Sequence, residues 1–300
     1  MTMDVRDLKP GDVLLFSPEE GSWISKAITW LTDAPVSHAA MTYQLPTKLV
    51  EETPPAVRIA DATLRFVDRT VHVMRLNKPV DDFKPVMDVA AKYLNGQAPY
   101  SMNNLYLLGI LLLYKKFTPN DETQKIILKI LKSLTERLLD AINQMKYPDK
   151  HPMVCSQFVF ECYLEAGKAY RLSIKDGVLK SDSPRPNLIT KAFKHTRKNS
   201  QLANLSAGAE SDDEQLAKQL YHAMNDETLL ASGVVSDELL DSIHDFAQTL
   251  HAVSQELELA KADPRQGLAI LQAQSSMFVT PGDLLRHCPE LRHVGDISLK

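Results

Sequence analysis

Apolar residues recur with two different periods along the first third of the chain, and these periods predict both strands and helices. Short alternating or continuous apolar runs predict strands at residues 13–16, 37–43, 57–62 and 70–76. Helical spacing predicts a short helix over residues 22–31, with Ser22 as its N-cap, and another over residues 81–94. The segment 45–56, which contains a Pro-Pro pair, is expected to form a surface loop.

The pattern changes after residue 103, where apolar residues become much denser. Residues 105–114 are nearly all apolar, and residues 121–145 carry the apolar face of a long amphipathic helix. Residues 197–214 are small and polar, as in a linker. Thr280 before Pro281 predicts an N-cap and first helical residue. Helices are also predicted at residues 214–224, 236–260 and 264–274, and a strand pair or irregular chain at 170–183.

Composition narrows the class of protein. With 300 residues, 44% hydrophobic and 24% charged, the chain can bury the core of one large or two ordinary domains. A formal net charge of -4 without a basic stripe argues against a nucleic-acid partner. The N-terminus has no basic-then-apolar signal, and residues 105–114 are too few to span a bilayer. We therefore expect synthesis in the cytoplasm, and export by a non-Sec route if the protein acts elsewhere.

The three cysteines form neither a CxxC pattern nor an even set. No zinc site, disulfide framework, metal or cofactor is therefore expected. Cys155 nevertheless opens a predicted amphipathic helix, where the helix dipole and unpaired N–H groups lower a thiol pKa and stabilise an oxyanion. The alternative is an inert Cys155, since free cysteine is among the most buried residue types. Cys162, further along the same helix, is expected in the core.

Two polar residues lie among apolar neighbours in the predicted strands. His38 opens one strand and Asp61 lies inside the next. If these strands pair, the two side chains come within reach, because cross-strand neighbours lie about 5 Å apart. Cys155, His38 and Asp61 would then act as nucleophile, base and orienter. Each alone also fits an ordinary structural role, as a core histidine or a capping carboxylate, and His72 is the competing base or orienter.

Five segments together resemble one family: PGDVLLF, SWISKAITWLT, SHAAMTY, IADAT and VCSQFVFECYLEAG. They are similar to the circularly permuted branch of the NlpC-type papain-like hydrolases, in which the histidine precedes the cysteine. The resemblance is greatest to the YiiX-like bacterial proteins and more distant to lecithin retinol acyltransferase. The family's motifs fall on His38, Asp61 and the pair Cys155-Ser156. The third residue is often glutamate in the YiiX-like group, so Glu51 or Glu52 is an alternative to Asp61.

The resemblance implies an α+β fold, in which a small antiparallel sheet packs on the cysteine helix of a permuted papain-like core. It further implies a catalytic core over residues 1–184, a helical insertion over 185–274, and a segment 275–300 that returns to the core. Tyr100 matches a position that lines the substrate pocket in relatives, although a packing role is equally open. Further pocket candidates are Ser156 and Tyr43.

The family implies hydrolysis or acyl transfer at an ester or amide carbonyl through an acyl-thioenzyme. The apolar run 105–117, which contains Lys115-Lys116, favours a lipid acyl ester at a membrane surface, as in a phospholipase or acyltransferase. A buried core helix is the alternative for this run. Peptidoglycan amide cleavage is the second functional class, and a catalytically inert interaction protein is the third. An envelope-targeting bacterial toxin is compatible with either enzyme, with any inhibitor or delivery partner unidentified.

Overall fold

The computed structural model describes residues 2–44, 47–116, 120–144, 152–178, 191, 195, 213–224, 234–254 and 275–299. It divides the chain into two compact units. The first comprises Met1–Leu105, Asp149–Asp182 and Ser275–Lys300, and the second comprises Tyr106–Pro148 and Ser183–Gln274. The first unit is therefore assembled from three separate stretches of sequence. This differs from the expected division at residue 184, because residues 106–148 join the second unit.

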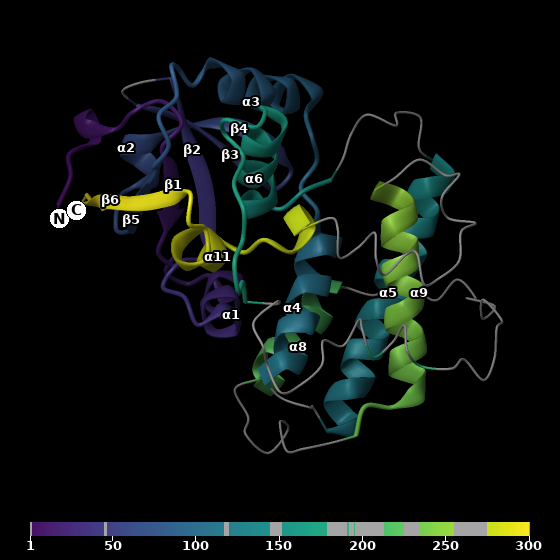
Figure 1. Ribbon diagram of the computed structural model, residues 1–300. Coiled ribbons are helices and arrows are strands. Elements are labelled where there is room, and N and C mark those ends of the chain that lie inside the picture. Colours follow the sequence, from purple (N-terminus) through teal and green to yellow (C-terminus); the bar gives the residue numbers. More distant parts are fainter. Residues whose placement is uncertain are drawn as a thin grey trace. The chain divides into compact units, whose positions relative to one another are not determined.

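The described elements follow in chain order, and Figure 1 carries their labels. The strands are β1 Val13–Phe16, β2 His38–Gln44, β3 Lys48–Thr53, β4 Ala56–Asp61, β5 Thr70–Leu76 and β6 Leu291–Ser298. The helices are η1 Val5–Asp7, α1 Trp23–Thr32, α2 Ala62–Arg65, α3 Lys84–Gly96, α4 Met102–Lys116, α5 Asp121–Gln144, α6 Cys155–Glu165, α8 Asp213–Met224, α9 Asp237–Ser254, η3 Ser275–Phe278 and α11 Pro281–Arg286.

The strands of the first unit form a six-stranded sheet in the order β4-β3-β2-β1-β5-β6. Every neighbouring pair in it is antiparallel. The protein is thus of the α+β class, as expected. β6 comes from the last described stretch and pairs with β5, which lies more than 200 residues earlier in the sequence. The C-terminal segment therefore completes the sheet of the first unit.

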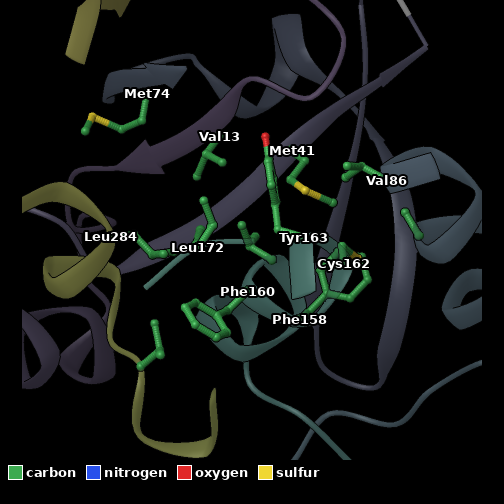
Figure 2. Packing of buried hydrophobic residues seen from close by; sticks show 14 of the residues in the cluster. Val13, Met41, Met74, Val86, Phe158, Phe160, Cys162, Tyr163, Leu172 and Leu284 are labelled. Carbon is green, nitrogen blue, oxygen red and sulfur yellow. The ribbon is translucent and has the colours of Figure 1, made fainter. Parts of the chain in front are cut away.

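Helix α6 lies against one face of this sheet and contacts β2 and β3 (Figure 1). Buried apolar side chains fill the layer between them, and Figure 2 shows Phe158, Phe160, Cys162 and Tyr163 of α6 facing Val13 and Met41 of the strands. The Tyr163 hydroxyl donates a hydrogen bond to the Gly11 carbonyl. The sequence predicts an amphipathic helix here, whereas α6 is buried on nearly all sides.

The opposite face of the sheet carries a second apolar cluster, which includes Leu14, Phe16, Leu49 and Phe66. Because successive strand residues point to opposite faces, Leu49 joins this second cluster while its neighbour Val50 joins the cluster under α6. The same alternation sends the side chains of Glu51 and Glu52 to different environments.

Several local predictions are confirmed. Strands β1 and β5 have the expected bounds, and the Ser22 hydroxyl accepts from the Ser25 N–H as the N-cap of α1. Thr280 caps α11, with Pro281 in the first turn. The expected loop 45–56 is wrong, because its described part contains strand β3. The predicted helix 264–274 lies outside the described residues, as does the predicted linker 197–214 except for residues 213 and 214, which begin α8.

In the second unit, α5 packs against α8 and α9. Ile127 and Leu131 of α5 and Ile243 and Phe246 of α9 are buried. In the apolar run of α4, the side chains from Leu108 to Tyr114 with a described burial are likewise mostly buried. No described helix is both long and apolar enough to cross a membrane.

Candidate active site

Cys155 is the first residue of α6 and lies in the first unit with only 5% of its surface exposed. Val154 occupies the N-cap position and provides no side-chain hydrogen bond, so the first N–H groups of α6 have no side-chain cap. Burial opposes ionisation of the Cys155 thiol, but the charge of His38 and hydrogen bonding from His38 and from the backbone N–H groups of Ala39 and Ser156 lower its pKa. The helix N-terminus is therefore arranged to stabilise negative charge on this sulfur.

His38 opens β2, directly opposite Phe16 of β1. The imidazole Nε2 lies 2.8 Å from Oε2 of Glu51. The contact with Glu51 leaves Nδ1 as the ring nitrogen available to the Cys155 thiol. The ring of Phe16 lies 5.5 Å from the imidazole centroid and packs beside it. The imidazole of His38 thus lies between the Cys155 thiol and the Glu51 carboxylate.

Glu51 lies on β3 and is completely buried. Its Oε1 accepts two hydrogen bonds from Arg58, at 2.8 and 3.0 Å. Its Oε2 accepts from Arg65 at 3.0 and 3.2 Å, in addition to the contact with His38. Burial alone would raise the pKa of this carboxyl group, but hydrogen bonding and the charge of His38, together with the two arginines, lower it to about 2. Glu51 is therefore a permanent anion beside the imidazole.

The thiol and the imidazole stabilise each other's charged forms. Burial would lower the pKa of His38, but the charge of Cys155 and hydrogen bonds to Cys155 and Glu51 raise it to about 9. Burial would likewise raise the pKa of Cys155, but the charge and hydrogen bond of His38 and two backbone N–H groups lower it. A thiolate–imidazolium pair is the form that these contacts favour near neutral pH.

The expected partnership of Asp61 with His38 is corrected. Strand β3 lies between β2 and β4, so Asp61 at the end of β4 is not a cross-strand neighbour of His38. Its carboxylate caps α2 through Thr63 and lies 3.0 Å from the Lys48 ammonium. Hydrogen bonds from Thr63 and Lys48 lower its pKa to about 2. Asp61 is thus a surface cap, and Glu51 occupies the place beside His38.

Glu52, the other alternative, lies in a different environment from Glu51. Its side chain is fully buried, and neither carboxyl oxygen has a hydrogen-bond partner within the described parts of the chain. Burial, reinforced by the charge of Cys155, raises its pKa to about 9. Glu52 is therefore a neutral carboxylic acid near neutral pH, unlike the anionic Glu51.

The competing histidine, His72, lies on β5, and strand β1 separates it from β2. Its Nδ1 lies 2.6 Å from Oδ1 of Asp296 on β6, and Nε2 of His293 lies 2.8 Å from the same oxygen. The three ligand atoms lie within 4.8 Å of one another, and the described residues contain no other such group with metal-ligand chemistry. His72 is thus engaged away from Cys155.

The three pocket candidates have structural contacts. The buried Ser156 hydroxyl donates to the Val279 carbonyl at 2.7 Å, so it serves the packing of α6. Tyr43 packs against the core cluster under α6. Tyr100 forms a backbone bridge with Met153, two residues before Cys155. Ser156 acts on the Cys155 sulfur through its backbone N–H group, whereas its hydroxyl is engaged with Val279.

Sequence patterns did not single out Arg58 and Arg65, which fix Glu51. The available signal is the pairing of carboxylates in KLVEET with arginines in VRIADATLR, two stretches joined by a Pro-Pro turn. Once they form neighbouring strands, Glu51 lies directly opposite Arg58. Recognising β3 is therefore the step that would have completed the site.

No family model matches the chain, and no curated protein matches it. The chemistry of the site therefore rests on its own residues: a thiol at a helix N-terminus, an imidazole whose charge lowers the pKa of that thiol, and a buried carboxylate 2.8 Å from the imidazole.

Proposed function

We propose that the protein is a cysteine hydrolase or acyltransferase with a permuted papain-like core, acting through a Cys155–His38–Glu51 triad. The observation that carries this proposal is the hydrogen-bonded chain from the Cys155 thiol through His38 to the buried Glu51 carboxylate. The order of the residues, with histidine before cysteine, agrees with the permuted NlpC-type resemblance. Glu51 takes the third role in place of Asp61.

The contacts give each residue a chemical task. The Cys155 thiolate attacks the substrate carbonyl, and the N-terminal N–H groups of α6 are available to stabilise the resulting oxyanion. The imidazolium of His38 then gives its proton to the leaving group, and an acyl-thioenzyme remains. Neutral His38 takes a proton from water, or from an alcohol or amine acceptor, which attacks the thioester. The acyl product leaves, and the thiolate–imidazolium pair is restored. Glu51 stabilises the imidazolium in both halves of the reaction.

A lipid acyl ester is the substrate class that we favour. The apolar residues of α4 no longer support it, because their described side chains are mostly buried. A different segment does. Leu64 on α2 is 76% exposed and Val67 is 42% exposed, and both flank Arg65, a direct partner of Glu51. Exposed apolar side chains beside arginines suit contact with an anionic lipid surface. Cleavage of peptidoglycan amides is the competing class.

Thiol labelling tests the nucleophile. Burial raises the pKa of Cys162 well above its usual value and that of Cys288 to about 12. We therefore expect iodoacetamide at neutral pH to modify Cys155 much faster than the other two cysteines, as measured by peptide mass spectrometry. Cys288→Ala is the control that should retain this reaction. Equal labelling of all three thiols would support the inert interaction protein and reject the triad.

Substrate assays separate the two enzyme classes. Wild type, Cys155→Ala and Asp61→Asn are incubated with anionic phospholipid vesicles and, separately, with purified peptidoglycan. Release of fatty acid or lysophospholipid by wild type and Asp61→Asn, but not by Cys155→Ala, supports the lipid class. Release of peptide fragments without lipid turnover rejects it in favour of the amidase. If Cys155 reacts selectively with iodoacetamide but the unlabelled protein turns over neither substrate, both substrate classes are rejected.

The site of action is tested in living bacteria. If the substrate belongs to the cell envelope, wild type directed to the periplasm should slow growth, whereas Cys155→Ala directed there should not. Wild type retained in the cytoplasm, where it has no access to peptidoglycan, is the control for growth. Growth unaffected by periplasmic wild type, at equal protein levels, would contradict an envelope target.

A further inference from the structure

The opposite end of the sheet from β4 carries a second cluster of reactive side chains. His72 on β5 lies directly opposite Asp296 on β6, and His293 lies on the same strand as Asp296. The three side chains are partly exposed, by 20% for His72, 42% for His293 and 37% for Asp296. They belong to the first unit but take no part in the triad, because strand β1 separates β5 from β2.

A bulge in the strand pairing brings these side chains together. Val73 pairs with Gly295, whereas the next residue, Met74, pairs with His293, so Val294 is the extra residue of β6. In a regular strand, residues three apart point to opposite faces. The extra residue shifts this alternation by one position, so that His293 and Asp296 lie on the same face of the sheet. There Asp296 contacts both His293 and His72.

The geometry of the cluster is compact. His72 Nδ1 lies 2.6 Å from Asp296 Oδ1, and His293 Nε2 lies 2.8 Å from that same oxygen. All three ligand atoms lie within 4.8 Å of one another, and the two imidazole centroids are 5.7 Å apart. The atoms therefore converge on one small volume, where metal–nitrogen and metal–oxygen bonds of about 2.0–2.2 Å are attainable with small side-chain movements.

The ligand types restrict the metal. Two imidazole nitrogens with one carboxylate oxygen suit Zn²⁺ and the neighbouring divalent transition metals, whereas Mg²⁺ and Ca²⁺ prefer sites made of oxygen ligands. Three protein ligands leave further coordination positions, and the partial exposure of all three side chains gives solvent access to them. The backbone around the cluster is also fixed, because the Met3 N–H donates to the Asp296 carbonyl at 2.8 Å.

We propose that His72, His293 and Asp296 form a binding site for a divalent transition-metal ion that links β5 to β6, with Zn²⁺ as the metal used to test it. Binding displaces any protons held by the two imidazoles and replaces the His–Asp hydrogen bonds by coordination to the ion. The ion stabilises the pairing of the final strand with the rest of the sheet. The catalytic triad is separate, so its thiol chemistry does not depend on this site.

Calorimetric titration of the full chain with Zn²⁺ tests the proposal. Cys155→Ala is the background, so that the reactive thiol does not compete for the metal. We expect equimolar binding, weakened at least about tenfold by His293→Ala or by Asp296→Asn. His287→Ala is the matched control, because His287 lies outside the cluster, and it should bind as the background does. Unchanged affinity in both ligand variants, or no binding to the background protein, would overturn the proposal.

A second measurement guards against variants that merely misfold. Co²⁺ bound at this site should give visible d–d absorption without a thiolate charge-transfer band, since the ligands are nitrogen and oxygen. Zn²⁺ should raise the melting temperature of the background protein and of His287→Ala, but not that of His293→Ala. A thiolate band, or an equal temperature shift in His293→Ala, would assign the binding to other residues.

Discussion

Glu51 holds a negative charge that is buried and contacted by His38, Arg58 and Arg65. Such a charge is tolerated because its lone pairs are occupied by charged donors. The arginines hold the carboxylate in position, and the carboxylate in turn favours the protonated form of His38. In the proposed mechanism, Cys155 therefore depends on residues that need not touch the substrate.

Replacing Glu51 with glutamine tests this positioning role. Glu51→Gln keeps the size of the side chain but removes the charge, so the pKa of His38 should fall and that of Cys155 should rise. We expect acyl turnover to fall by about a hundredfold or more, and the pH midpoint of iodoacetamide labelling to move upward. Asp61→Asn is the matched control and should change neither. Equal losses in the two variants would contradict the assignment of Glu51.

Glu52 provides a separate test through stability. Its pKa is about 9 in the folded chain, against an ordinary value of 4.5. Between these values the unfolded chain is ionised and the folded chain holds a proton, so the free energy of unfolding contributed by Glu52 falls as pH rises. The slope reaches at most about 1.4 kcal/mol per pH unit. In a Cys155→Ala background, Glu52→Gln should therefore flatten the pH profile between about 5 and 8.

Urea unfolding at several pH values measures this effect. The exposed Glu20→Gln is the control and should leave the profile of the background protein unchanged. Parallel profiles for Glu52→Gln and the background would mean that Glu52 is ionised in the folded chain.

At this scale, the sequence singled out Cys155 and His38 as the proposed nucleophile and base, but it did not single out the arginines that contact Glu51. Cys155 at a predicted helix start and His38 at a predicted strand start could be recognised from neighbouring residues alone. The carboxylate partner of His38 could not be recognised in this way. Asp61 and Glu51 are both carboxylates close to predicted strands, and only the pairing of the strands shows which of them lies beside His38. Arg58 and Arg65 acquire their role only after β3 and β4 lie side by side.

Among the elements, α6 depends on α11 and the residues before it. The Ser156 hydroxyl donates to Val279, and the next residue, Thr280, caps α11 in a reciprocal arrangement with Asp283. Asp283 also accepts from the Val178 N–H at 2.7 Å. Val279, which contacts α6, is therefore held in place by the Thr280 cap of α11.

Removing that cap should destabilise the first unit. Thr280→Val keeps the shape of the side chain but loses the hydroxyl that bonds Asp283, so we expect a loss of about 1–2 kcal/mol in the free energy of unfolding. Thr280→Ser keeps the cap and should lose less. Chemical denaturation with a fluorescence readout compares the two. A larger loss in the serine variant would show that methyl packing, not capping, stabilises this site.

Strand β3 is the element of the sheet that the sequence pattern did not predict. Its sequence KLVEET begins with a lysine and contains two adjacent glutamates, which is unusual for a buried strand. The strand forms because one glutamate is neutralised by cations and the other stays protonated. Both effects depend on tertiary contacts and leave no local sequence pattern. By contrast, β1 is continuously apolar and β5 largely alternates polar with apolar residues, and both were predicted with their bounds.

On the scale of the whole chain, the first unit depends on a strand that lies far in sequence from Cys155 and His38. Ile297 of β6 is 1% exposed and belongs to the cluster on the face of the sheet opposite α6. Ser298, its neighbour, is exposed. The final strand therefore contributes core packing to the unit that holds Cys155.

A charge placed on this strand should report that dependence. Ile297→Asp buries a carboxylate without a cationic partner and should cost at least about 3 kcal/mol, with loss of selective Cys155 labelling. Ser298→Asp adds the same charge at the exposed neighbour and should leave both unchanged. Thermal unfolding and labelling are measured together. Normal labelling in a folded Ile297→Asp would show that the triad forms without an intact β6.

The interleaving of the two units also bears on how a broken chain behaves. A single break of the backbone between residues 183 and 274 gives two fragments, one with Cys155, His38 and Glu51 and the other with β6. Both fragments supply strands to the same sheet. Such a nicked protein should remain one particle under native conditions and come apart only in denaturant. We therefore expect two complementing fragments to reconstitute the first unit, and the activity proposed for Cys155 to require both of them.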